Sequence, residues 1–278
     1  MRSLTLRLSP ALWHALDRHR HETGEPIGHL VRAALADYLQ VDHQTLFQVS
    51  TAGALVEGIY RGAVTVGQLR QHGDFGLGTF EGVDGEMVLL DGHAWQIRSD
   101  GECHAVDDAT ESPFAVVTHF HAEQRLELGE CADLAALTAQ LDRLRGSSNV
   151  FYAVRIDGTF RLLHTRAMCR SEEGVPLVVV AAHQPEFQLH EVRATLVGFW
   201  SPAYAKTVGI PGYHLHAVTA DRRHGGHVLE CAAAGLRVQI QALNDLRVAL
   251  PASAEFLRAD LSRDPSGDLQ RVEEKTGR

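Results

Sequence analysis

The chain has 278 residues, of which 45% are hydrophobic, and a formal net charge of -9 with histidine neutral. This length predicts a main domain with a smaller one beside it, and the acidic balance argues against a nucleic-acid-binding surface along the whole chain. The sequence has neither an apolar run of transmembrane length nor an apolar N-terminal signal region, so we expect a soluble, cytoplasmic protein.

The first predicted elements are a short strand and a helix. Residues 3–8, Ser-Leu-Thr-Leu-Arg-Leu, alternate between polar and apolar side chains, which is the period of a strand. Ser9 and Pro10 then form a typical helix start, with a capping hydroxyl before a proline in the first turn. The helix should run to about Glu22 and end at Gly24, because glycine readily adopts the left-handed conformation that closes a helix.

A second amphipathic helix is predicted after Pro26, where apolar side chains recur at helical spacing between Ile27 and Leu39. A strand and two helices in about 40 residues are too small to bury a core of their own. We therefore expect a first domain, residues 1–42, that needs a partner.

This segment, through LTLRLSPALWHALD and TGEPIGHLVRAALADYL, resembles the ribbon–helix–helix DNA-binding family. The resemblance implies that two chains pair their strands and expose Ser3, Thr5 and Arg7 on a ribbon that can contact DNA bases. Residues 1–44 carry no net charge, so the electrostatic contribution to DNA affinity would be small. The alternative is an arm that only dimerises.

The second predicted domain covers residues 45–278, after a hinge near residues 41–44. Short apolar runs alternate there with glycine-rich turns such as GDFGLGTFEGVDGE and RIDGTF, which predicts a β-rich domain and an α+β fold overall. The polar residues after Pro265 are expected to form a tail. Helices are predicted at residues 66–71, 132–145 and 254–261, the last with Ser253 as its N-cap.

A histidine cluster is the first candidate for chemistry. His214 and His216 share one face of a predicted strand, and the turn-like residues 221–226 would return His227 on the neighbouring strand. Three imidazoles that leave one coordination position open are typical of catalytic zinc. The chain has 17 histidines and repeats the His-x-His spacing elsewhere, so a surface hairpin in a histidine-rich protein is the alternative.

Glu86 and Arg166 are two further candidates. Glu86 follows an Asp-Gly turn and begins an apolar strand, where a solvated turn carboxylate is the alternative interpretation. Arg166 ends a predicted strand, and its guanidinium could hold a substrate carboxylate through two hydrogen bonds. A surface arginine would look the same in the sequence.

From about residue 45 to its end, the chain resembles bacterial α-acetolactate decarboxylases. The resemblance implies a dimeric protein built largely on β-sheets, in which His214, His216 and His227 bind zinc. It also implies that Glu86, Arg166 and Glu273 surround the metal, with Glu274 as the alternative to Glu273. The matching stretches are QVSTAGALVEGIYRG, HGDFGLGTFEGVDGEM, FYAVRIDGTFRLLHTR, QPEFQ, TLVGFWSPAYAKTVGIPGYHLH and GGHVLE.

The expected reaction is the conversion of 2-acetolactate to acetoin and carbon dioxide by a homodimer or a larger homo-oligomer. Zinc would act as a Lewis acid, Arg166 would orient the substrate carboxylate, and Glu86 or Glu273 would donate the proton. One alternative is a DNA-binding regulator whose larger domain senses acetolactate or a related acid. Another is a zinc hydrolase on a β-rich fold.

Overall fold

The computed structural model describes residues 5–24, 26–39 and 44–273. The chain divides into two compact units, residues 1–43 and residues 44–278. Among the described residues, no helix is long and apolar enough to cross a membrane.

The first unit contains two helices, α1 (Pro10–Thr23) and α2 (Ile27–Leu39). The hydroxyl of Ser9 accepts a hydrogen bond from the N–H of Leu12, and Gly24 closes α1 with a φ of 77°, so both predicted ends are correct. Residues 5–9 form no strand, and residues 3 and 4 lie outside the described residues. The predicted strand is therefore not confirmed, as expected for a segment that needs a second strand to pair with.

None of the described apolar side chains of the first unit is buried, and several are exposed to solvent. Helix α1 has no buried residue. The large apolar side chains that are exposed here are Leu6, Leu12, Trp13, Leu35, Tyr38 and Leu39.

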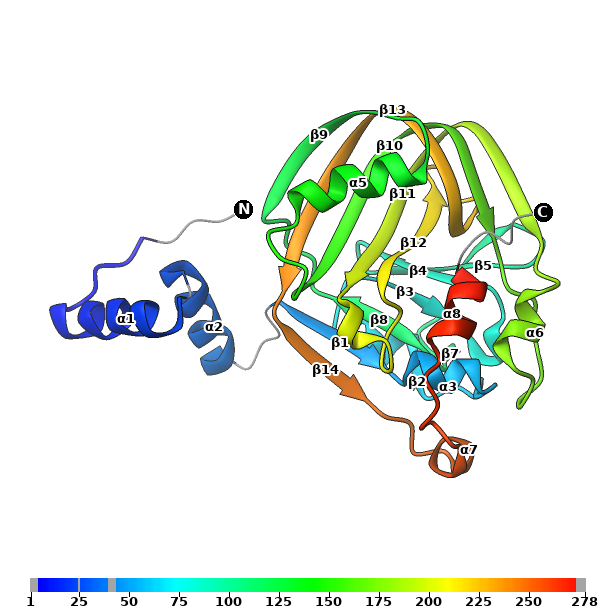
Figure 1. The fold of residues 1–278 in the computed structure, drawn as a ribbon, viewed down its shortest axis with the longest axis horizontal. Coiled ribbons are helices and arrows are strands. Elements are labelled where there is room, and N and C mark those ends of the chain that lie inside the picture. Colours follow the sequence, from blue (N-terminus) through cyan, green and yellow to red (C-terminus); the bar gives the residue numbers. More distant parts are fainter. Residues whose placement is uncertain (1–4, 25, 40–43, 274–278) are drawn as a thin grey trace. The chain divides into compact units, whose positions relative to one another are not determined.

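The second unit is built on two large sheets (Figure 1). The first is a mixed sheet of order β14-β1-β8-β3-β4-β5-β6, in which only β1 and β14 are parallel. Its strands are β1 (Thr45–Val49), β3 (Phe75–Thr79), β4 (Glu86–Leu90), β5 (His93–Ile97), β6 (Cys103–Ala105), β8 (Ala115–Thr118) and β14 (Asp245–Ala249).

The second sheet is antiparallel, with the order β10-β11-β12-β13-β9 and an additional pairing of β10 with β13. Strands β10 to β13 thus close into a ring in which each strand pairs with two others. Its strands are β9 (Gln124–Cys131), β10 (Phe151–Arg166), β11 (Glu186–Ser201), β12 (Gly212–Thr219) and β13 (Gly225–Leu243). A separate small pairing joins β2 (Val64–Thr65) and β7 (Glu111–Ser112).

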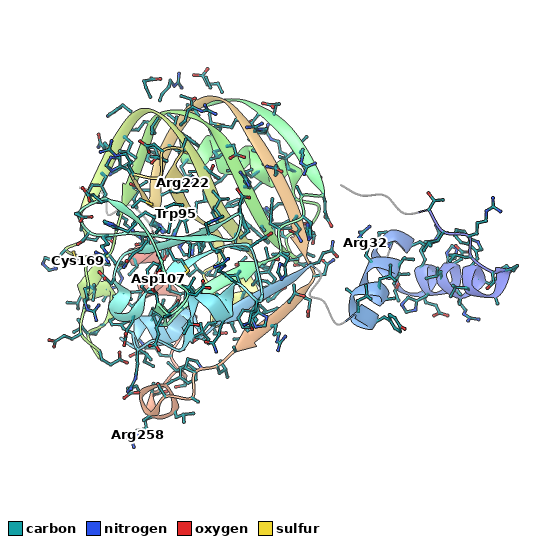
Figure 2. All side chains as sticks on the ribbon, turned by 180° about the vertical axis from the view of Figure 1, so that it is seen from behind. Arg32, Trp95, Asp107, Cys169, Arg222 and Arg258 are labelled. Carbon is teal, nitrogen blue, oxygen red and sulfur yellow. The ribbon has the colours of Figure 1, made fainter. Side chains whose placement is uncertain are left out.

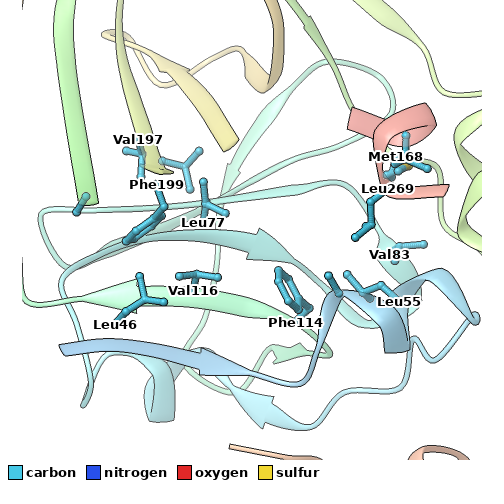
Figure 3. Packing of buried hydrophobic residues seen from close by; sticks show 14 of the residues in the cluster. Leu46, Leu55, Leu77, Val83, Phe114, Val116, Met168, Val197, Phe199 and Leu269 are labelled. Atoms are coloured by element: carbon cyan, nitrogen blue, oxygen red, sulfur yellow. The ribbon is translucent and has the colours of Figure 1, made fainter. Parts of the chain in front are cut away.

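One hydrophobic core contains residues of both sheets. Leu77 and Val116 of the first sheet belong to the same buried cluster as Val197 and Phe199 of β11, and Figure 3 shows these side chains facing one another. A second core contains the other face of the antiparallel sheet and helix α5 (Leu134–Leu144). A third includes residues of the first sheet and of α4 (Val66–Leu69). The predicted β-rich fold with mixed and antiparallel sheets is confirmed.

The remaining helices are short. The predicted helices at 66–71, 132–145 and 254–261 are present with narrower bounds, and Ser253 caps the last of them as expected. That last helix is α7 (Ala254–Arg258). The others are α3 (Ala52–Val56), α6 (Leu177–Ala181) and α8 (Ser266–Glu273), with 3-10 turns at Glu81–Val83 and Ala203–Ala205.

The expectation of a polar tail after Pro265 is wrong. Residues 266–273 form α8, and Leu269 and Val272 on one face of it are buried in the core that contains residues of both sheets. Residues three apart lie on the same face of a helix, so these two apolar side chains can pack that face against the core although the segment as a whole is polar.

Candidate active site

Three histidines come together on the hairpin of β12 and β13. His214 and His216 point to the same side of β12 because alternate residues of a strand share a face, and His216 lies directly opposite His227 across the two strands. One ring nitrogen from each of the three lies within 4.8 Å of the others. The hairpin geometry expected from the sequence is present, while the role of these residues as zinc ligands stays a prediction.

Two glycines let β13 approach both of its neighbours at this point. A Cβ on Gly225 would lie 2.2 Å from the carbonyl oxygen of Ala217 in β12. A Cβ on Gly226, whose φ is 129°, would lie 2.4 Å from the carbonyl oxygen of Arg166 in β10. Because only glycine fits there, His227 can pair with His216 on one side and with Arg166 on the other.

The turn between β12 and β13 is attached to the first sheet. The guanidinium of Arg222 lies 5.8 Å from the ring centre of Trp95 in β5, and Figure 2 labels both residues. The N–H of Cys103 in β6 donates to the carbonyl oxygen of Arg223 over 2.9 Å. These contacts fix the turn that joins the strands of His216 and His227.

The imidazoles have the protonation that a metal ligand needs. The Nδ1 of His216 lies 2.8 Å from the carbonyl oxygen of Met87, so Nδ1 carries the proton and Nε2 keeps its lone pair. Burial, followed by the charge of Arg166, lowers the pKa of His214 to about 3. Burial likewise holds the pKa values of His216 and His227 well below their usual value.

The spacing of two of the nitrogens is close to that of ligands on a small tetrahedral ion. The Nε2 atoms of His214 and His216 lie 3.1 Å apart. Two nitrogens bound tetrahedrally to one zinc at about 2.0–2.1 Å would be about 3.3 Å apart.

Two glutamates face the histidines, of which Glu86 is buried and Glu273 is partly exposed. One carboxylate oxygen of Glu86 lies 3.3 Å from Nε2 of His216, and one of Glu273 lies 3.5 Å from Nε2 of His227 and 3.7 Å from that of His214. Burial raises the pKa of Glu86 to about 8, although Arg166 and the N–H of Met168 oppose the shift. Burial also raises the pKa of Glu273 to about 7, again opposed by Arg166. Both groups can therefore hold a proton near neutral pH.

Arg166 supplies a positive charge at the same point. It is the last residue of β10, only 3% exposed, and its Nε is buried with no hydrogen-bond partner among the described residues. A buried donor without a partner is costly, and a ligand with an anionic oxygen would satisfy it.

The three histidines, the two glutamates and Arg166 line one cavity, and most of the rest of its wall is apolar. The cavity encloses about 50 Å³, a few times the roughly 10–15 Å³ that one water molecule needs, so it suits a small ligand. Apart from Leu269 and Val272, which share a face of α8, nothing in the sequence distinguishes the apolar lining from other core residues. That lining includes Leu55, Val83, Phe114, Leu177, Ile210, Leu269 and Val272.

The residues predicted to contact DNA belong to the first unit. Thr5 and Arg7 are exposed and lie outside helices and strands, and Ser3 lies outside the described residues. Their contact with DNA stays a prediction. Glu274, the alternative to Glu273, also lies outside the described residues.

The chain is similar to known decarboxylases over most of its length. The family model described as "Alpha-acetolactate decarboxylase" matches residues 46–263, which leaves out the first unit and α8. Alpha-acetolactate decarboxylase from Methanosarcina mazei is 41% identical over 229 residues, 82% of this chain and 80% of the relative. The protein of that name from Methylococcus capsulatus is 40% identical over 233 residues, 84% of this chain and 89% of the relative.

The second unit also resembles solved structures. The crystal structure of alpha-acetolactate decarboxylase from Bacillus subtilis strain 168 superposes with a TM-score of 0.81 at 34% identity, covering 83% of this chain and 100% of that one. A Staphylococcus aureus protein of unknown function, described as similar to alpha-acetolactate decarboxylase, gives a TM-score of 0.79 at 31% identity, covering 82% of this chain and 100% of that one.

Proposed function

Because this chain belongs to the alpha-acetolactate decarboxylase family and is a carboxy-lyase, we propose that it converts 2-acetolactate to acetoin and carbon dioxide with the help of a zinc ion. The observation that carries the proposal is the convergence of three imidazoles, those of His216 and His227 buried and that of His214 partly buried, on a small cavity. The same cavity is lined by one arginine and two protonatable glutamates.

His214, His216 and His227 would hold the zinc through neutral imidazole nitrogens. Three neutral ligands leave the full charge of the ion available, and bound zinc would supply a Lewis acid for the ketone oxygen of the substrate. The hydrogen bond from His216 to the carbonyl oxygen of Met87 keeps that ring in the tautomer and orientation that this role requires.

Arg166 would bind the substrate carboxylate. Its buried Nε has no partner among the described residues, and a planar guanidinium can form two parallel hydrogen bonds to a carboxylate. This contact would hold the bond that breaks perpendicular to the plane of the ketone, so that its electrons can enter the π system of the carbonyl group. When carbon dioxide leaves, the electron pair of the broken bond moves onto the neighbouring ketone.

Glu86 or Glu273 would then deliver a proton to carbon, which completes acetoin. Burial raises the pKa of both carboxyl groups, which favours their protonated form, so either can act as a general acid. They reach the histidine cluster from different elements, β4 and α8. Protonation from one fixed direction would give one enantiomer of acetoin.

The apolar wall of the cavity would receive the two methyl groups of the substrate. Leu55, Phe114 and Ile210 are part of this wall. It would also exclude water, which strengthens the electrostatic interactions inside the cavity.

The direct test is to incubate the purified protein with 2-acetolactate and to measure acetoin, with and without a zinc chelator. We expect turnover that the chelator abolishes and that added zinc restores. Acetoin production by fully metal-free protein would contradict the role of zinc. Binding of 2-acetolactate without turnover would favour the alternative of a ligand-sensing regulator.

We also propose that residues 1–43 pair with the same segment of a second chain. The supporting observation is that α1 has no buried residue while Leu12, Trp13 and Tyr38 are exposed, so a partner is needed to cover them. DNA binding through Ser3, Thr5 and Arg7 is a further proposal that rests on the resemblance alone. A salt-dependent binding assay that compares wild type with Arg7→Ala would test it.

A further inference from the structure

We propose that Arg145, Asp142 and Tyr213 form a clamp that positions His214 from the opposite side of the sheet. The three residues lie outside the cavity and do not touch substrate or metal, so they are positioning residues. The inference rests on the proposed role of His214 as a zinc ligand.

The clamp is a closed set of hydrogen bonds between the end of α5 and the start of β12. The Nε of Arg145 donates to the hydroxyl of Tyr213 over 3.0 Å, and that hydroxyl donates to a carboxylate oxygen of Asp142 over 3.0 Å. Arg145 also donates to the same carboxylate oxygen. Each of the three residues therefore contacts the other two.

A ring stack holds the arginine in place. The guanidinium carbon of Arg145 lies 3.6 Å from the ring centre of Trp200, and Trp200 lies directly opposite Tyr213 in the pairing of β11 with β12. The side chain of Arg145 is only 8% exposed. A buried cation over an aromatic face is held more firmly than an exposed surface ion pair.

His214 depends on this anchor more than the other two histidines do. The ring of His216 is fixed through Nδ1 by the carbonyl oxygen of Met87, and His227 lies between paired neighbours in β10 and β12. No hydrogen bond within the described part of the chain involves Nδ1 of His214. His214 is also only two residues from the start of β12 at Gly212, where a strand frays most easily.

The clamp acts on His214 through the backbone. Successive side chains of a strand point to opposite faces, so Tyr213 points toward α5 while His214 points into the cavity. When the hydroxyl and ring of Tyr213 are held, the peptide between the two residues is held as well. The direction of the Cα–Cβ bond of His214 follows from it.

The experiment measures zinc affinity rather than activity. The metal-free wild type and the variants Tyr213→Phe and Arg145→Lys would be titrated with zinc in competition with a chromophoric chelator. Loss of an outer group that orients a ligand typically weakens metal binding about 10–100-fold, so we expect zinc affinity to fall at least about tenfold in both variants. The visible spectrum of the cobalt-substituted variants should also change, because it reports the geometry of the bound nitrogens.

Asp133→Ala is the matched control. Asp133 caps the other end of α5 by accepting the N–H of Ala136 over 2.7 Å, so its loss weakens the same helix without touching the clamp. We expect this variant to unfold at a lower temperature than the wild type but to keep the wild-type zinc affinity and cobalt spectrum.

Wild-type zinc affinity and an unchanged cobalt spectrum in Tyr213→Phe would contradict the proposed role of the clamp. So would an equal loss of zinc affinity in Asp133→Ala, since the effect would then reflect general stability. A wild-type protein that binds no zinc would instead refute the proposed function, which separates the two failures.

Discussion

The polar groups of the cavity are supported in two different ways. Five of them, Glu86, Arg166, His214, His216 and His227, belong to strands of the two large sheets. The sixth, Glu273, is the last residue of the eight-residue helix α8. The first five are fixed by strand pairing on both sides of the cavity, whereas Glu273 depends on how well one short helix stays in its place.

Ion pairs attach the start of α8 and the residues just before it. Arg263 contacts Glu57 over 2.7 Å and Asp268 over 2.8 Å, and Lys206 contacts Asp264 over 2.6 Å. Only the apolar pair Leu269 and Val272 is buried. Exposed ion pairs contribute about 0–1 kcal/mol each, so the comparison teaches that Glu273 is held less firmly than the five residues on the sheets.

Among the site residues that lie on strands, His216→Ala is expected to have the largest effect. We expect this variant to lose its bound zinc and to lose more than about a thousandfold in kcat/KM, because one of three metal ligands is missing. Metal analysis of the purified variant and an acetoin assay measure both effects. A fully active variant would exclude His216 from the metal site.

The contribution of α8 and Glu273 is tested by truncation after Pro265, which removes the helix. We expect activity to fall by more than about a hundredfold, the contribution typical of a general acid, while zinc content and the fold of the sheets remain. Circular dichroism and metal analysis check the second part. Glu273→Gln is the finer control, since it keeps the helix and removes only the acid. Activity in the truncated protein would show that Glu86 is a sufficient proton donor.

Arg166→Lys tests the orientation of the substrate. Lysine keeps the charge but loses the planar pair of donors, so we expect kcat/KM to fall about tenfold or more. Zinc content should not change, because Arg166 is not a ligand. Steady-state kinetics that match the wild type would show that the substrate carboxylate binds elsewhere.

A smaller effect is expected when only the attachment of α8 is weakened. Arg263→Ala removes two exposed ion pairs, and we expect kcat to fall about twofold to fivefold in low salt. The difference from the wild type should shrink as salt is added, because salt screens the same pairs in the wild type. A loss that is independent of salt would point to a different role for Arg263.

The smallest effect on catalysis is expected from deletion of residues 1–43. The described residues that line the cavity all belong to the second unit, so kcat/KM should stay within about twofold of the full chain. Its removal should lower the molar mass measured by light scattering in solution, if the exposed apolar face of α1 and α2 pairs with a second copy. An unchanged assembly would show that this face has another partner.

The sequence predicts the sheet-borne part of the site better than the rest. The period of a strand and the length of the turn are local properties, and they are enough to bring His214, His216 and His227 together. The pairing of Arg166 with His227 joins strands that are far apart in the chain, so only the resemblance singled it out. Helix α8 was missed because its composition is polar and only two residues are buried. The clamp of Arg145 and Tyr213 has no local signal, because its members come from separate elements.

The ring formed by β10, β11, β12 and β13 has a consequence for hydrogen exchange. Amide protons exchange when a strand opens, and opening starts most easily at an unpaired edge. The stretch of β13 around His227 is paired with both β10 and β12. We therefore expect the amides beside His216 and His227 to exchange slowly even in metal-free protein, while those of β14, at the edge of the first sheet, exchange early.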